Sequence, residues 1–361
     1  MRFSCEKSVL FSVFQTAKAA VSPKNPLPIL AGIKFEAKGG RVTFTGTDLE
    51  MEIRRSVDAE VEESGAAVLP ARVVGELLRS LPEGPVVFEL TRANSVAVKY
   101  GQSKAVINGF DPEEFPEFSL SESEMRFSLE GAVFKDVVKR VSFAANPDDI
   151  SRPVFTGVFF ELDGNKGTAV ATDTHRLALL QFPLATGTAE GSFIIPVKAL
   201  SETAKGVGDQ EVETVFTGSA VCFSTGDARF SARLIEGQFP DYRKVIPSKF
   251  ETKTVLSAEI ASVLDRAKLF AGVVKLHVGE ASLTVEAVSE IGELREEAPA
   301  CTEGPPLTVA VDAKYLSEAL RAVSGDEIVL EFTGPLSPML ARAVGDDNYL
   351  GLVLPVRLPG N

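Results

Sequence analysis

The sequence lacks the features that mark membrane and exported proteins. No apolar run approaches the ~18 residues that a membrane-spanning helix needs, and residues 1–7 (MRFSCEK) contain no apolar signal-peptide core. The three cysteines, Cys5, Cys222 and Cys301, show no CxxC spacing, so no zinc site is indicated. Scattered cysteines without a pairing pattern are typical of a reducing compartment. We therefore expect a cytoplasmic protein without membrane contact.

The sequence is also poor in catalytic motifs. It has two histidines, His175 and His277, and no HExxH, GxSxG or Gly-rich phosphate loop. Asp173 lies two residues before His175, so one hypothesis is a soluble α+β hydrolase that uses this pair, but no nucleophile motif accompanies it. Asp48 holds the corresponding place 125 residues earlier without a histidine nearby. We therefore expect no enzyme activity, no metal and no cofactor.

Basic residues are the minority among the charged ones. There are 37 Lys and Arg against 50 Asp and Glu, a formal net charge of −13, which ordinarily argues against a nucleic-acid binder. The length of 361 residues predicts two to four domains, and the hydrophobic content of 45% is enough for real cores. Any surface that attracts nucleic acid must therefore be local.

One ten-residue pattern recurs three times, over residues 72–81, 198–207 and 314–323. Its third, sixth, seventh and tenth residues are apolar, with Thr203 the single exception, and this spacing predicts the buried face of an amphipathic helix. Its first and eighth residues are basic, and at about 100° per residue they lie within ~20° of each other. The six basic residues are Arg72, Arg79, Lys198, Lys205, Lys314 and Arg321. Three helices should therefore carry a basic row on the face turned away from the core.

An ordinary interpretation of these rows stays open. The fifth residue of each copy is Glu76, Glu202 or Glu318, and a glutamate three residues before a base is a common stabilising pair on a helix surface. The recurrence by itself proves duplication only.

Each copy lies within a longer repeat. An earlier amphipathic helix is predicted at about 8–20, 132–144 and 258–271, and alternating residues predict strands after it. The predicted strands are 32–36, 41–45, 85–89, 157–161, 167–171, 214–216, 272–277, 282–286 and 327–332. The repeats predict an α+β fold of three similar domains, 1–122, 123–248 and 249–361. Each should have two helices and roughly eight strands, with sheets covering one side of the helices and the basic rows left on the other.

Five motifs spread over the whole chain resemble one known family. They are Leu27-Pro28-Ile29-Leu30, Thr45-Gly46-Thr47-Asp48-Leu49-Glu50-Met51, Ala171-Thr172-Asp173-Thr174-His175-Arg176-Leu177, Phe239-Pro240-Asp241-Tyr242-Arg243 and Pro355-Val356-Arg357-Leu358. Together they resemble the bacterial β sliding clamps, the processivity subunits of DNA polymerase III. The resemblance implies a head-to-tail homodimer, a closed ring whose helices line a hole for duplex DNA and whose sheets lie outside. A scaffold that never meets DNA is a further alternative.

The resemblance also implies partners and sites. DNA would be held without sequence specificity by the six basic residues above and by Lys24. The protein partners would be the polymerase catalytic subunit, an ATP-dependent clamp loader, repair polymerases and mismatch-repair proteins. They would dock short peptides in a groove between the second and third domains. The matching residues are Arg152, Phe155, Thr172, His175, Arg176, Leu177, Pro240, Lys244, Val245, Tyr315, Leu336, Pro338, Leu354, Pro355, Val356 and Arg357.

Within that groove, Leu177, Val245, Leu354 and Val356 would form an apolar floor, with His175, Arg176 and Arg357 at the rim. Lys244 stands where the family has arginine, and Pro359-Gly360-Asn361 extends past the usual end. The dimer contact would join Lys104, Ala105 and Ile107 on an edge strand to Leu269 and Phe270 at a helix end. Ala105 is smaller than the aromatic residue that the family often carries there.

Overall fold

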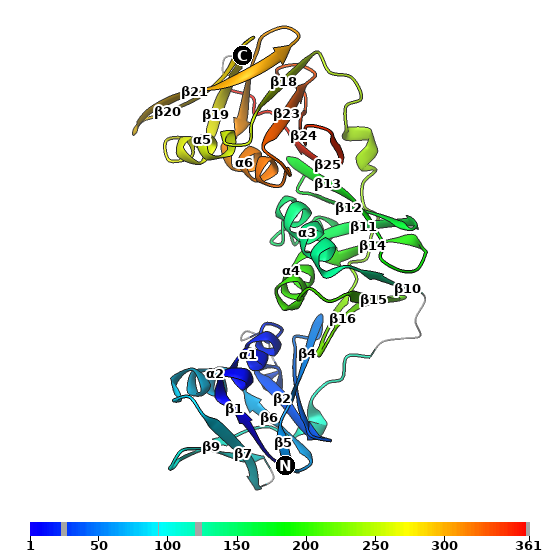
Figure 1. Cartoon of the computed structure of the whole chain (residues 1–361), viewed down its shortest axis with the longest axis vertical. Helices are drawn as coiled ribbons and strands as arrows, with labels where there is room; N and C mark the ends of the chain where they lie inside the picture. Colours follow the sequence, from blue (N-terminus) through cyan, green and yellow to red (C-terminus); the bar gives the residue numbers. More distant parts are fainter. Residues whose placement is uncertain (23–26, 93, 120–124, 359–361) are drawn as a thin grey trace. The chain divides into compact units, whose positions relative to one another are not determined.

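The computed structural model describes residues 1–22, 27–92, 94–119 and 125–358, which form six α-helices and three β-sheets (Figure 1). By their contacts they divide into two compact units. The first comprises Met1–Ala132, Ala185–Gly187 and Ala199–Leu234, and the second comprises the rest. The helices are α1 (Lys7–Lys18), α2 (Ala71–Ser80), α3 (Gly131–Val141), α4 (Val197–Gly206), α5 (Ile260–Ala267) and α6 (Ala313–Arg321). Short 3-10 helices are η1 (Pro28–Ala31), η2 (Pro112–Glu114), η3 (Ser142–Ala144), η4 (Pro153–Thr156) and η5 (Tyr242–Val245).

The first unit contains two antiparallel sheets, with strand orders β5-β1-β7-β8-β9 and β10-β15-β16-β17-β4-β3-β2-β6. Their strands are β1 (Arg2–Glu6), β2 (Gly32–Lys38), β3 (Arg41–Thr47), β4 (Met51–Asp58), β5 (Glu60–Glu63), β6 (Gly65–Pro70), β7 (Pro85–Arg92), β8 (Ser95–Tyr100), β9 (Ser103–Asn108), β10 (Met125–Leu129), β15 (Val212–Thr217), β16 (Ala220–Thr225) and β17 (Ala228–Arg233). Helices α1 and α2 lie side by side, α1 against β3 and β4 and α2 against β2 and β6 (Figure 1). Between helices and strands, Phe3 stacks on Phe88 at 5.2 Å and Phe35 meets Phe44 at 4.8 Å, so aromatic rings fill this core.

The second unit is organised on one sheet of order β14-β11-β12-β13-β25-β24-β23-β18-β21-β20-β19-β22. Its strands are β11 (Gly157–Gly164), β12 (Lys166–Thr172), β13 (Arg176–Pro183), β14 (Ala189–Pro196), β18 (Thr252–Ser257), β19 (Val273–Val278), β20 (Ser282–Ser289), β21 (Gly292–Glu303), β22 (Leu307–Asp312), β23 (Glu327–Phe332), β24 (Met339–Ala343) and β25 (Asp346–Val353). Helices α5 and α6 lie side by side on the core of its last repeat (Figure 1).

The boundary between the two units falls inside the central repeat. Strand β17 of that repeat pairs with β4 of the first, and β13 of the same repeat pairs with β25 of the last. Successive repeats therefore share continuous sheets, and the sequence positions 122 and 248 stay predicted domain boundaries.

The predicted helix stripes agree with the observed burial. Leu78, Leu200 and Leu316 are buried on α2, α4 and α6. Thr203, which interrupts the apolar pattern, is also buried, and its hydroxyl donates to the carbonyl of Ala199 at 2.8 Å. A threonine fits this interior position because the helix backbone itself accepts its hydrogen bond.

Candidate functional site

The residues around Thr172 form a tight turn between β12 and β13. The Asp173 carboxylate accepts the backbone N–H groups of His175 (2.9 Å) and Arg176 (3.0 Å), and the Thr172 hydroxyl donates to the carbonyl of Arg176 (2.6 Å). Thr174 has φ 78°, a left-handed conformation that β-branched residues rarely adopt. The side-chain bonds stabilise this strained turn and fix the direction in which β13 begins.

Asp173 and His175 do not form a catalytic pair. Besides the two backbone groups, the Asp173 carboxylate accepts Nε of Arg176 at 3.0 Å. The His175 ring instead stacks on Tyr315, with centroids 6.3 Å apart. A carboxylate that activates histidine must bind the imidazole, so this geometry gives the pair a structural role in the turn.

Arg176 is buried and connects the turn to helix α6. Its guanidinium forms an ion pair with Glu318 and lies over the Tyr315 ring, with Cζ 4.4 Å from the centroid. Both partners belong to α6, so one side chain fixes β13 to that helix. Burial raises the pKa of the Tyr315 phenol, and the nearby Asp173 carboxylate raises it further.

An apolar cluster covers one face of the sheet next to this turn. Its buried members are Val170, Leu177, Leu179, Ile194, Phe239, Tyr242, Leu340, Leu350 and Leu352. Leu354 packs against the cluster while remaining half-buried, and its backbone N–H donates to the carbonyl of His175 at 2.9 Å. Leu177 is only 3% exposed. Leu354 rather than Leu177 therefore presents apolar surface to an incoming ligand.

The other two residues predicted for the floor lie differently. Val245, in η5, is 52% exposed, and Val356 is half-buried, with its N–H donating to the carbonyl of Ala310 at 2.8 Å. Neither belongs to the apolar cluster. The floor is thus centred on Leu354 and the cluster beneath it, because the leucines of β13 and β25 are buried inside that cluster.

Charged and aromatic side chains lie next to the turn in the same unit, where Arg152 donates a hydrogen bond to the Thr174 hydroxyl at 3.4 Å. Arg152 is exposed, pairs with Asp149 (2.7 Å) and lies over the Phe155 ring at 5.0 Å. A hydrogen bond from Ser151 lowers the pKa of Asp149, and Arg152 adds to that effect. The remaining predicted groove residues are exposed or half-buried: Pro240, Lys244, Leu336, Pro338, Pro355 and Arg357. Among them, Lys244 pairs with Asp241 at 3.1 Å.

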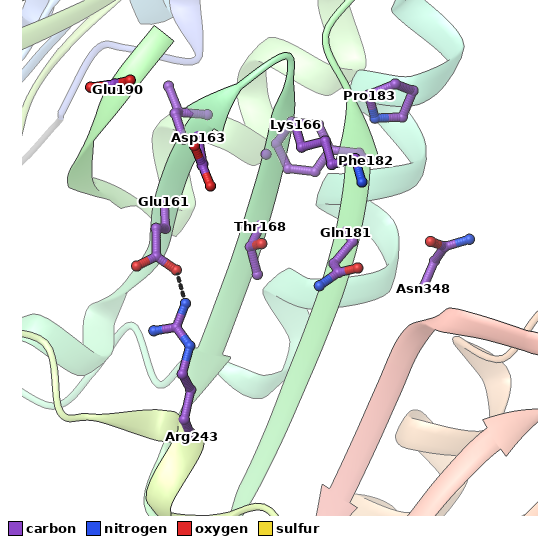
Figure 2. Close-up of a pocket in the computed structure, with 12 residues that line it drawn as sticks. Glu161, Asp163, Lys166, Thr168, Gln181, Phe182, Pro183, Glu190, Arg243 and Asn348 are labelled. Atoms are coloured by element: carbon purple, nitrogen blue, oxygen red, sulfur yellow. Dashed lines mark hydrogen bonds and ion pairs between the residues drawn. The ribbon is translucent and has the colours of Figure 1, made fainter.

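A polar hollow of about 830 Å³ lies on the same face of the sheet (Figure 2). Leu177, Leu179 and Gln181 alternate along β13, so the cluster and the hollow share a face. At their boundary Glu161 accepts the hydroxyl of Tyr242 at 2.9 Å and pairs with Arg243. The hollow is lined mainly by polar and charged groups, so it is a poor site for an apolar anchor.

The six predicted basic residues are all exposed, on α2, α4 and α6. Arg72 pairs with Glu76 at 3.5 Å and Lys205 with Glu202 at 2.7 Å, as ordinary helix-surface pairs do. Arg321 pairs with Asp265 of α5, because Glu318 is held by Arg176. Weak exposed pairs of this kind leave the arginines and lysines available to an external anion.

The predicted contact strand β9 is an edge strand of its sheet. Lys104 is exposed and Ala105 half-buried, but Ile107 is 7% exposed and packs in the core. Ile107 is therefore covered within its own unit, and its place in the interface stays a prediction. Strand alternation turns Val106, 58% exposed, outward instead.

The second predicted contact region is partly open. Leu269, just after α5, is 73% exposed, whereas Phe270 is half-buried against the core. Val288 and Ile291, in and after β20, are also exposed. The sequence pattern did not identify them, because an apolar residue in or beside a strand is ordinarily expected to be buried. Among the described residues, β21 pairs with β20 along 292–299 and with β18 from Ala300 onward, which leaves one edge of its first half open.

Three further expectations concern residues outside the described ranges, metal ligands and membrane-spanning helices. Lys24 and residues 359–361 lie outside the described ranges. Within those ranges, no cluster of three His, Cys, Asp or Glu residues could hold a metal ion. No described helix is long and apolar enough to cross a membrane.

Comparisons with known proteins match the whole chain. Models of the DNA polymerase III beta subunit match in order, the N-terminal domain at 1–119, the central domain at 128–241 and the C-terminal domain at 243–357. Beta sliding clamps of Staphylococcus aureus and Staphylococcus epidermidis are 32% identical over 375 residues, and the alignment covers 99% of each chain.

Solved structures agree with these matches. The DNA polymerase sliding clamp of Bacillus subtilis is 31% identical, with a TM-score of 0.93 and 99% of both chains covered. The beta subunit of Streptococcus pyogenes DNA polymerase is 27% identical, with a TM-score of 0.93, covering 99% of this chain and 100% of that one. The α+β fold of three repeated domains expected from the sequence is confirmed.

Proposed function

Because the chain belongs to the DNA polymerase III beta subunits, the sliding clamps, and is a non-catalytic processivity factor, we propose that two copies close a ring around duplex DNA in the cytoplasm. The observation that carries the proposal is the exposed basic row repeated on α2, α4 and α6 in an otherwise acidic chain. A ring needs positive charge only on its lining, since a closed ring is held by topology and not by phosphate affinity.

Helix dimensions are compatible with this ring. Two chains supply twelve helices, each about 10 Å across, so a ring of helices has a circumference of about 120 Å and an opening of roughly 25–30 Å. Such an opening admits a duplex and a layer of water. The basic residues then contact phosphates transiently or through water and read no base sequence.

We propose that the ring closes between β9 of one chain and the α5–β21 region of the other. Each region has an open strand edge and exposed apolar residues, Val106 on one and Leu269 and Ile291 on the other. Lys104 is exposed on β9, and Glu293 and Glu297 are exposed on β21, so the two proposed edges are also complementary in charge. Open edges with apolar residues otherwise favour aggregation.

Partner proteins bind, in this proposal, through short peptides whose apolar side chain packs on Leu354 and the cluster beneath it. In the same proposal, His175, Arg152 and Arg357 supply hydrogen-bond donors for the peptide backbone and polar groups. These partners are the polymerase catalytic subunit, an ATP-dependent clamp loader, repair polymerases and mismatch-repair proteins. One exposed anchor explains how unrelated partners can share a site.

Light scattering and a peptide titration test the proposal together. The full chain should have a mass of about 77 kDa, twice the chain's 38.6 kDa, and should bind a fluorescent QLxLF-type peptide. Deleting residues 354–361 should preserve the dimer and abolish peptide binding, whereas deleting only 359–361 should preserve both. Undiminished affinity after the longer deletion would place the peptide elsewhere.

A further inference from the structure

The turn that begins β13 recurs in the first unit, at the start of β4. The Thr47 hydroxyl donates to the carbonyl of Met51 at 2.8 Å, and the Asp48 carboxylate accepts the Met51 N–H at 2.8 Å. Leu49 has φ 80°, close to the 78° at the same position of the 172–176 turn. Two turns 125 residues apart therefore share their hydrogen bonds and their strained residue.

The strands that follow the turns also pair alike. Strand β4 lies antiparallel to β17 in the first unit, as β13 lies antiparallel to β25 in the second. At the end of each partner strand one N–H bonds back to the turn, from Arg233 to the carbonyl of Glu50 and from Leu354 to that of His175, both at 2.9 Å. The two junctions between successive repeats thus share one backbone framework.

The side chains on the shared face have opposite character. At the second junction, five positions of this framework hold leucine. By strand register, Glu52 stands for Leu177, Arg54 for Leu179, Arg229 for Leu350, Ser231 for Leu352 and Arg233 for Leu354. The face that is an apolar floor at one junction is charged and polar at the other.

The polar groups at the first junction are engaged in contacts of their own. Glu52 is 2% exposed, and its carboxylate accepts Nη2 of Arg54 at 3.2 Å. Arg233 donates from Nε to the carbonyl of Leu49 at 3.2 Å, and its guanidinium lies over the Phe118 ring at 5.7 Å. An apolar side chain docked here would remove water from these charges without replacing their hydrogen bonds.

We infer that the first junction is a second copy of the peptide groove, closed to apolar anchors by Glu52, Arg54 and Arg233. The inference rests on the proposed groove at Leu354 and adds the residues that decide which junction binds. Each chain then offers one peptide site, and a dimer offers two, although the framework for the groove is present twice per chain.

A matched exchange of side chains tests this inference in the full-length dimer. Leu354→Arg copies the first junction into the second, and it should weaken the QLxLF-type peptide at least tenfold while leaving the mass unchanged. Arg233→Leu makes the reciprocal change outside the groove and should leave that affinity unchanged. A wild-type chain that binds no peptide would refute the proposed groove. A Leu354→Arg chain that binds as well as the wild type would refute that groove too, so these two variants test the premise, and the inference alone is tested at the first junction.

A gain of binding is the stronger test. The triple variant Glu52→Leu, Arg54→Leu, Arg233→Leu removes the buried Glu52–Arg54 pair as a whole, so no uncompensated charge stays behind. Calorimetric titration should find one peptide per chain in the wild type and a second, weaker site in the folded variant. Two peptides per wild-type chain, or one per folded triple variant, would overturn the inference. If the variant fails to fold, the wild-type stoichiometry still decides, since two peptides per chain would show that the first junction is open.

Discussion

Arg176→Met isolates the side chain that fixes β13 to α6. Methionine is the residue at the corresponding position of the first turn, Met51, where the same backbone bonds form without an arginine. The turn itself should therefore tolerate the substitution. What is lost is the charged donor to Asp173 and the ion pair and ring contact with α6.

The cost follows from burial. Arg176 and Asp173 are each 7% exposed, and removing one partner of a buried ion pair costs about 3–5 kcal/mol. Asp173 retains two backbone donors, so we expect the lower end, about 3 kcal/mol. For a cooperative unit of this size, that corresponds to a fall in melting temperature of roughly 6–12 °C.

Differential scanning calorimetry measures this fall, and Arg152→Met is the matched control. Arg152 pairs with Asp149 at the same i, i+3 spacing, but its side chain is exposed, so the melting temperature should fall by about 1–2 °C at most. In the double variant Asp173→Asn/Arg176→Met, the amide oxygen of Asn still accepts the two backbone N–H groups, and no buried charge is left unpaired. Part of the fall in melting temperature caused by Arg176→Met should therefore be recovered. Equal falls for Arg176→Met and Arg152→Met would refute the role given to burial.

Three other perturbations have defined outcomes. Burial raises the pKa of Tyr242 and of Tyr349, so the folded chain holds both protons more tightly than the unfolded chain. The free energy of unfolding should therefore fall as the pH rises past about 10, the pKa of unfolded tyrosine. Tyr349→Phe should make the fall in urea midpoint between pH 9 and 11 smaller, and an unchanged fall contradicts this. Val106→Asp or Leu269→Asp should each give a folded 38.6 kDa particle by light scattering, and an intact dimer from both would move the interface. Arg79→Gln, which removes two arginines per dimer, should lower the salt slope of weak binding to short linear DNA by up to about 1.8, measured by anisotropy, and an unchanged slope would place Arg79 away from the phosphates.

Local periodicity in the sequence was enough to predict the helices and the repeat. The stripe through Leu78, Leu200 and Leu316 is buried as expected, and even the exception Thr203 follows a local rule, because its partner is one helical turn away. Residues whose surroundings come from distant parts of the chain were predicted less well. Ile107 packs in the core of its own unit and its neighbour Val106 is exposed, because alternation along a strand defines two faces but does not say which one is covered.

Long-range pairing also decided the character of the candidate site. Glu318 has the spacing of a helix-surface partner for Arg321, yet it binds Arg176 from another repeat. Leu177 was expected in an open floor, but it is buried among side chains of neighbouring strands, and Leu354 is the leucine of that floor that stays accessible. Neither outcome is encoded by spacing along the chain, since both depend on which strands become neighbours.

The central claim, that the chain holds DNA by enclosing it, is tested most directly by retention on a circle. The labelled protein is loaded onto nicked circular DNA with a clamp loader, separated from free protein by gel filtration, and the DNA is then cut once with a restriction enzyme. We predict that the protein stays with the circle in salt high enough to abolish binding to short linear DNA, and that it leaves when the cut opens the circle. Retention that is the same before and after the cut would contradict enclosure.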